Sequence, residues 1–121
     1  MNLALAALLV FVVVVLTEGM VLRRLAWGTP LRCLGVSLLA NLLSFPAALL
    51  LAQVTVRPDG VLLFDLAFLF GAAMALEVVV LHTLRRDRNK LQVVRAVVTA
   101  NTASFILLSL VSVLWLFAGG Q

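Results

Sequence analysis

The sequence predicts an all-α integral membrane protein, a four-helix bundle made of two transmembrane hairpin repeats. Composition is the first reason: the 121 residues are 64% hydrophobic and 12% charged, whereas soluble domains are about half apolar and a quarter charged. The second reason is that the apolar residues fall into four long runs. The third is that the same polar residues recur in the same order in both halves of the chain.

The four apolar runs cover approximately residues 3–22, 34–54, 61–84 and 93–117. Each run has about 20 residues or more, which is enough to cross a hydrocarbon core about 30 Å thick. The runs use nearly the whole chain, so we expect a single membrane domain over residues 1–121 with no soluble domain. The first run has no basic residue before it and no small-residue cleavage site after it. We therefore expect it to be a retained helix and not a signal peptide.

The basic residues predict one orientation in the membrane. The segments 23–32 and 85–95 are rich in arginine, whereas the segment 53–60 carries one Arg and one Asp and neither terminus is basic. The positive-inside rule places segments 23–32 and 85–95 in the cytoplasm and both termini outside. We expect a prokaryotic cytoplasmic membrane, and no nucleic-acid partner, because topology explains the basic charge. Anionic lipid headgroups are expected partners near Arg23, Arg24, Arg85 and Arg86.

An internal repeat is predicted from the alignment of residues 18–45 with 77–105, with one inserted residue. Identical residues occupy nine aligned positions, where about three would be expected by accident in such an apolar chain. These pairs are Glu18–Glu77, Val21–Val80, Leu22–Leu81, Leu25–Leu84, Leu31–Leu91, Ala40–Ala100, Asn41–Asn101, Ser44–Ser104 and Phe45–Phe105. We assign repeat 1 to residues 1–55 and repeat 2 to residues 60–118. Because each repeat has two spans, both enter the membrane the same way, and the pseudo-twofold axis is parallel to the membrane normal.

The recurring polar residues predict a site in the cytoplasmic half of the bilayer. Counted from the nearest arginines at 1.5 Å per residue, both Glu lie about 8–12 Å inside the basic rim and both Asn about 9–14 Å. Asn and Ser three residues apart share a helix face. The predicted site residues are Glu18, Glu77, Asn41, Asn101, Ser44 and Ser104, and Ser37 extends the stripe by one turn. Pro46 is expected to kink the second span beside this layer.

The chemistry of such a layer is limited by the cost of burying charge. No Lys or Arg lies deep in any span, so each carboxylate must be protonated, bind a cation or accept hydrogen bonds. Carboxylate, amide and hydroxyl oxygens suit Na⁺, Ca²⁺, Mg²⁺, Mn²⁺ or a proton. We expect no other cofactor. A lone cysteine, Cys33, excludes an intramolecular disulfide and a thiolate metal cluster.

Two functions of different classes are compatible with this pattern. The leading hypothesis is a small membrane transport or ion-binding protein that uses the Glu/Asn layer. The alternative is a non-catalytic accessory subunit or assembly factor, in which the layer fixes helix register or binds a partner's basic residue. An enzyme is not expected, because there is one His and no His-Glu-x-x-His spacing. Four short helices enclose little volume, so we expect a homo-oligomer or a larger membrane complex.

Overall fold

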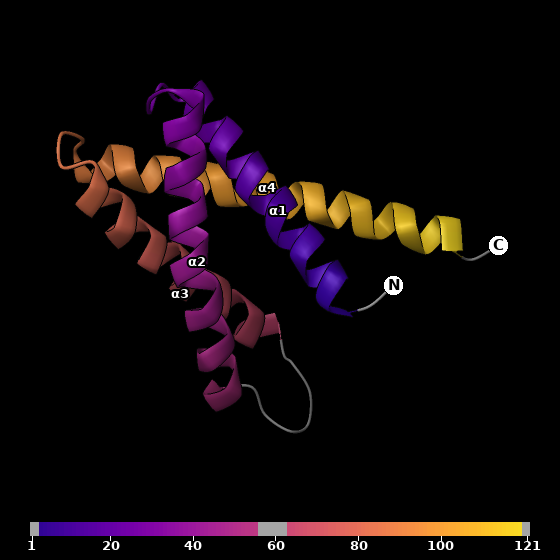
Figure 1. The fold of residues 1–121 in the computed structure, drawn as a ribbon. Coiled ribbons are helices and arrows are strands. Elements are labelled where there is room, and N and C mark those ends of the chain that lie inside the picture. Colours follow the sequence, from indigo (N-terminus) through magenta and orange to yellow (C-terminus); the bar gives the residue numbers. More distant parts are fainter. Residues whose placement is uncertain (1–2, 56–62, 120–121) are drawn as a thin grey trace.

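The computed structural model describes residues 3–55 and 63–119, and these form four α-helices (Figure 1). The helices are α1 (Leu3–Arg24), α2 (Pro30–Thr55), α3 (Leu63–Leu84) and α4 (Lys90–Gly119). All four are long and apolar enough to cross a membrane, so the predicted all-α class with four helices of membrane-spanning length is confirmed. The predicted start of repeat 2, at residue 60, lies outside the described residues.

The connection between α1 and α2 is set by backbone hydrogen bonds at the end of α1. The N–H of Trp27 donates to the carbonyl of Leu22, and the N–H of Ala26 donates to the carbonyl of Arg23. This is a Schellman motif, in which the residue after the cap adopts the left-handed conformation, and Ala26 has φ 58°. Pro30 then begins α2, where its missing N–H has no helical partner to lose. The helix therefore ends one turn before the Gly28-Thr29-Pro30 break in the sequence.

The connection between α3 and α4 ends in a reciprocal cap. The N–H of Gln92 donates to Asn89 Oδ1 at 2.8 Å, and the N–H of Asn89 donates to Gln92 Oε1 at 3.3 Å. This is the geometry of a capping box, in which two otherwise unpaired N–H groups at a helix start are satisfied. The cap allows α4 to begin at Lys90. The non-helical connections are consequently 25–29 and 85–89, shorter than the segments 23–32 and 85–95 that hold the basic residues.

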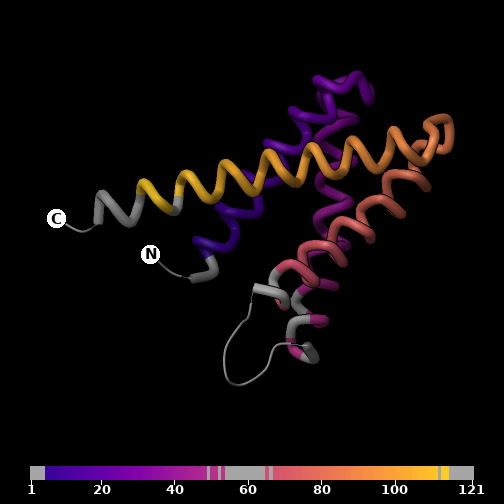
Figure 2. Tube along the Cα trace, turned by 180° about the vertical axis from the view of Figure 1, so that it is seen from behind, coloured from indigo at the N-terminus to yellow at the C-terminus, as the bar shows by residue number. Residues whose placement is uncertain are grey.

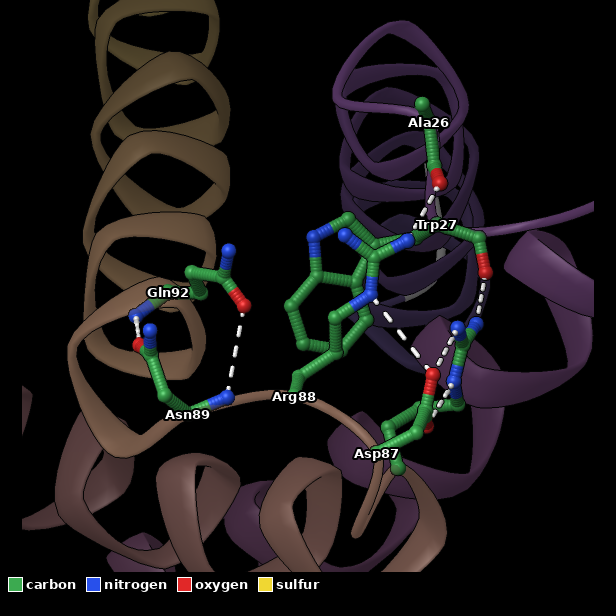
Figure 3. A network of polar contacts seen from close by, with 7 residues as sticks. Ala26, Trp27, Asp87, Arg88, Asn89 and Gln92 are labelled. Carbon is green, nitrogen blue, oxygen red and sulfur yellow. Dashed lines mark hydrogen bonds and ion pairs between the residues drawn. The ribbon is translucent and has the colours of Figure 1, made fainter.

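The two connections are joined by arginines of the second onto backbone carbonyls of the first (Figure 3). Arg85 donates to the carbonyl of Trp27, and Arg88 donates to the carbonyl of Ala26 at 3.0 Å. Both guanidinium groups also lie over the Trp27 ring, 5.6 and 5.7 Å from its centroid. Asp87 holds Arg85 through two hydrogen bonds of 2.9 and 2.8 Å. These contacts tie the two hairpins together at the end where the chain makes its tight turns.

Each helix packs against two others, since α1 and α3 both contact α2 and α4. The helices cross and then separate toward the chain termini, as the ribbon and the view from behind both indicate (Figures 1 and 2). The α1–α2 crossing is close because residue 19 is glycine: a Cβ there would lie 2.7 Å from Leu34 Cδ2 and 3.3 Å from Leu34 Cα.

Pro46, the residue expected to kink the second span, lies inside α2, and α2 continues as a helix beyond it.

The core occupies the half of the molecule near the two tight connections. Its buried apolar residues are Leu22, Trp27, Cys33, Ala40, Leu81, Val93, Ala96 and Val97. By contrast, the first half of α1 and the second half of α4 have exposed leucines and valines on several sides, including Leu8 and Leu114. Burial therefore increases from the start of α1 and the end of α4 toward the layer in which the polar residues lie.

Candidate functional site

The structure brings all six predicted site residues into one buried layer. Glu18 and Glu77 are 3% and 4% exposed, and both asparagines and both serines are also buried. Ser37, which the sequence marks only as an extension of the polar stripe, is 1% exposed and belongs to the same layer. The four helices each contribute to it, because α1 and α3 supply the carboxylates while α2 and α4 supply the amides and hydroxyls.

Glu18 is enclosed by three side-chain partners. Asn41 Nδ2 donates to Oε2 at 2.5 Å, and Ser37 Oγ lies 3.3 Å from the same oxygen. Ser104 Oγ lies 3.2 Å from Oε1. Two of these partners come from α2 and one comes from α4, so both carboxylate oxygens have a polar neighbour inside the protein.

Glu77 is held by two side-chain partners. Asn101 Nδ2 donates to Oε2 at 2.6 Å, and Ser44 Oγ donates to Oε1 at 3.0 Å. The position that corresponds to Ser37 in the alignment is Val97, which is buried and offers no hydrogen bond from its side chain. Among the described residues, Glu77 therefore has one side-chain polar partner fewer than Glu18.

The two asparagines are oriented in the same way. Each side-chain nitrogen also donates to the carbonyl four residues earlier in its own helix, Asn41 to Ser37 at 3.0 Å and Asn101 to Val97 at 3.1 Å. A side-chain amide has two N–H donors and its oxygen has none. With one N–H on the backbone and the other on a glutamate, the nitrogen is fixed as the atom that faces the carboxylate.

The serine contacts cross between the hairpins, whereas the asparagine contacts stay within them. Asn41 binds Glu18 and Asn101 binds Glu77, across sequence separations of 23 and 24 residues. Ser104 reaches back to Glu18, and Ser44 reaches forward to Glu77. Each carboxylate is thus coordinated by an amide of its own hairpin and a hydroxyl of the other, and neither hairpin completes its site alone.

The hydroxyls beside Glu18 have two alternative acceptors each. Ser37 Oγ lies 3.0 Å from the carbonyl of Val15, and Ser104 Oγ lies 3.0 Å from the carbonyl of Asn101. A hydroxyl has one proton to donate and lone pairs to accept. When these serines donate to the backbone, their oxygens face Glu18 as acceptors, which suits a protonated carboxyl. When they donate to Glu18, they suit a carboxylate, so the same positions serve both protonation states.

Both asparagines face the carboxylates with N–H donors, which limits what the layer can bind without rearranging. Within the described residues, neither glutamate pairs with a cationic side chain, and no cluster of three or more His, Cys, Asp or Glu could hold a metal ion. Asn41 and Ser44 lie one helical turn apart on α2, so their glutamate partners lie close together along this helix. A small cavity of about 50 Å³ adjoins Ser44 between α2 and α3 and is otherwise lined by Ala and Leu.

Two aromatic pairs flank the polar layer on the side away from the connections 25–29 and 85–89. Phe11 of α1 contacts Phe45 of α2 edge-on, with ring centroids 6.3 Å apart. Phe70 of α3 contacts Phe105 of α4 at 5.8 Å. Sequence spacing identifies Phe45 and Phe105, but their partners lie outside the aligned segments and only the packing reveals them.

No family model matches the sequence, and no curated protein or solved structure matches it significantly.

Proposed function

We propose that this chain is a small membrane transport or ion-binding protein that uses the Glu18/Glu77 layer in the cytoplasmic half of the bilayer. The observation that carries this proposal is the burial of two carboxylates, within helices able to span a membrane, with no cationic side chain to neutralise them. Ionisable groups inside membrane helices are costly and commonly belong to ion or proton pathways. Interhelical hydrogen bonds contribute about 0.6 kcal/mol on average in membrane proteins, which is a weak reason to bury two glutamates.

A proton is the ligand that fits this arrangement best. The amide N–H donors point at the carboxylates, whereas a bound metal ion would need the amide oxygens turned inward. The serines beside Glu18 can donate to it or accept from it without leaving their positions. The mechanism would couple protonation of the carboxylates to the occupancy of a cation or solute that remains unassigned.

The two hairpins are proposed to be parallel repeats related by a pseudo-twofold axis along the membrane normal. Support comes from the crossed serine contacts and from burial at corresponding positions. The buried pairs are Glu18–Glu77, Leu22–Leu81, Cys33–Val93, Ser37–Val97, Ala40–Ala100, Asn41–Asn101 and Ser44–Ser104. The two phenylalanine pairs recur at the same spacing. In the proposed orientation, connections 25–29 and 85–89 are cytoplasmic and both termini are outside.

The test is a comparison of wild type with the Glu18→Gln, Glu77→Gln double variant. We expect the melting midpoint of wild type in detergent to vary with pH and the variant to lose this dependence. A ligand that binds only the folded state adds about 2.7 kcal/mol at a hundredfold over its dissociation constant, so a cation panel at fixed pH reveals a specific ion. In proteoliposomes, a pH-sensitive dye would report proton uptake by wild type and none by the variant.

Asp87→Asn is the matched control, because it removes one carboxylate from an exposed connection outside the layer. It is expected to keep both the pH dependence and the proton uptake of wild type. If the double variant equals wild type in proton flux and in every ligand response, the transport proposal is wrong.

An accessory or assembly subunit is the second candidate, and one observation favours it. The exposed apolar halves of α1 and α4 extend beyond the region where the four helices contact one another. The layer would then fix helix register, since its polar groups find partners within the chain. Native purification separates the candidates: a stoichiometric partner favours the accessory role, and a self-contained oligomer favours transport.

A further inference from the structure

A groove of about 350 Å³ lies between the α1–α2 connection and the start of α4. It is lined by Leu25, Trp27, Arg88, Gln92, Arg95, Ala96 and Thr99. Among the described residues no carboxylate lines it, and two guanidinium groups do. The polar side chains of the lining are therefore cationic or able to donate hydrogen bonds, which is the chemistry of an anion site.

Two side chains that line the groove, Gln92 and Arg88, are held in place by contacts with neighbouring residues. Gln92 Oε1 accepts the N–H of Asn89, so the side-chain NH₂ is the end left for a ligand. In Figure 3 this NH₂ and the indole nitrogen of Trp27 face each other across the gap. Arg88 is fixed by its bond to the carbonyl of Ala26 and by its position over the Trp27 ring. A guanidinium group has five N–H donors, so Arg88 retains donors for an anion.

The charge near the groove is not cancelled by the nearby acid. Asp87 is engaged by two hydrogen bonds with Arg85, and its closer oxygen is 3.8 Å from Arg88 Nε. The side chain of Arg85 is 11% exposed, and it donates hydrogen bonds to Asp87 and to the carbonyl of Trp27. The basic charge that remains available on this side belongs to Arg88 and Arg95.

The groove also has an apolar wall that continues into the membrane-spanning part of α4. Thr99 lies nine residues after Lys90, where this span begins, or about 13 Å along the helix. Ala96 lines the groove one turn before that depth, and exposed Leu25 lines it from the other side. A ligand that fills the groove would thus need an anionic group at the rim and an apolar part beneath it.

We propose that this groove binds an anionic phospholipid, with its phosphate between Arg88, Arg95 and Gln92 and its apolar part against exposed Leu25. The phosphate is the shared chemistry of a lipid headgroup and a soluble phosphate ester, and the apolar wall favours the lipid. Basic pockets beside transmembrane helices commonly recognise such headgroups. The site does not depend on the transport proposal, because the groove is separate from the glutamate layer.

The experiment uses the full chain with Trp115→Phe, which leaves Trp27 as the single tryptophan. The protein in neutral detergent is titrated with phosphatidylglycerol, phosphatidylcholine and glycerol 3-phosphate, and the fluorescence of Trp27 is followed. We expect saturable binding of phosphatidylglycerol and a dissociation constant weakened about tenfold by Arg95→Gln, the loss expected for a hydrogen bond to a charged group. Arg88→Gln is measured as a second variant.

Arg32→Gln is the matched control, because Arg32 is an exposed arginine at the start of α2 that is not in the groove lining. It should weaken binding less than twofold. Equal weakening by Arg32→Gln and Arg95→Gln would overturn the proposal in favour of general surface charge. Equal affinity for glycerol 3-phosphate would overturn the lipid assignment, and equal affinity for phosphatidylcholine would overturn the anion selectivity. The melting midpoint of Arg95→Gln checks that the fold is retained.

Discussion

In the first hairpin, α1–α2, and in the second, α3–α4, each carboxylate is bound by an asparagine of its own hairpin. Each also contacts a serine hydroxyl of the other hairpin. They differ at one position in the layer: Ser37 in the first hairpin corresponds to Val97 in the second, so Glu18 has a third polar partner that Glu77 lacks. A shared scaffold thus carries two unequal sites. We therefore expect Glu77 to depend more than Glu18 on each donor that it has.

The hairpins also differ at their tight connections. The first connection offers bare carbonyls at Ala26 and Trp27, and the second supplies Arg85 and Arg88 to bind them. Asp87 belongs only to the second connection and keeps Arg85 in position. The second hairpin therefore supplies the donors of this contact, and the first hairpin supplies the acceptors.

The largest expected effect comes from removing an amide. Asn101→Leu should lower the free energy of unfolding by about 2 kcal/mol, since a donor to a buried charged group is lost. Asn41→Leu should cost about half of this, because Glu18 keeps Ser37 and Ser104. Melting in detergent measures both, and Thr102→Leu, at the exposed neighbouring position, is the control. Equal losses at the two asparagines would contradict the inequality of the sites.

A smaller effect is expected from moving the third donor. Ser37→Val should lower the free energy of unfolding by about 0.6 kcal/mol, the typical value of an interhelical hydrogen bond. The double swap Ser37→Val, Val97→Ser transfers the extra hydroxyl to Glu77. In that background, Asn41→Leu should become more damaging than Asn101→Leu. An unchanged order would show that Ser37 does not cause the difference between the hairpins.

The smallest effect is expected at Asp87, outside the layer. The hydrogen bond from Arg85 lowers the pKa of Asp87 to about 2. Because the folded value lies below the ordinary value of 3.8, the stabilisation is present above the ordinary value and is lost as pH falls through about 2. Asp87→Asn should therefore shift the melting midpoint slightly and by the same amount at pH 5 and pH 8. A shift that changes between these values would indicate another partner.

Much of the candidate site was accessible from residue spacing. Glu18 and Asn41, and likewise Glu77 and Asn101, recur at nearly equal separations, and helical rise placed all four at one depth. Residue spacing did not indicate that the serines bind across hairpins, because this depends on which helices are neighbours. The contact of Phe11 with Phe45 and the contact of Ser37 with Glu18 also depend on how the helices pack, so residue spacing did not indicate them.

By itself, the sequence determined the all-α class and the four membrane-length helices, because run length and apolar content follow directly from residue order. Only the tertiary structure decided how the hairpins share their donors, where the connections begin and end, and which arginines remain available. A hydrogen bond forms within about 3 Å and requires alignment, and that precision depends on helix crossing and rotation. In this chain, the glycine at position 19, the left-handed Ala26 and the arginine contacts between the connections set those features.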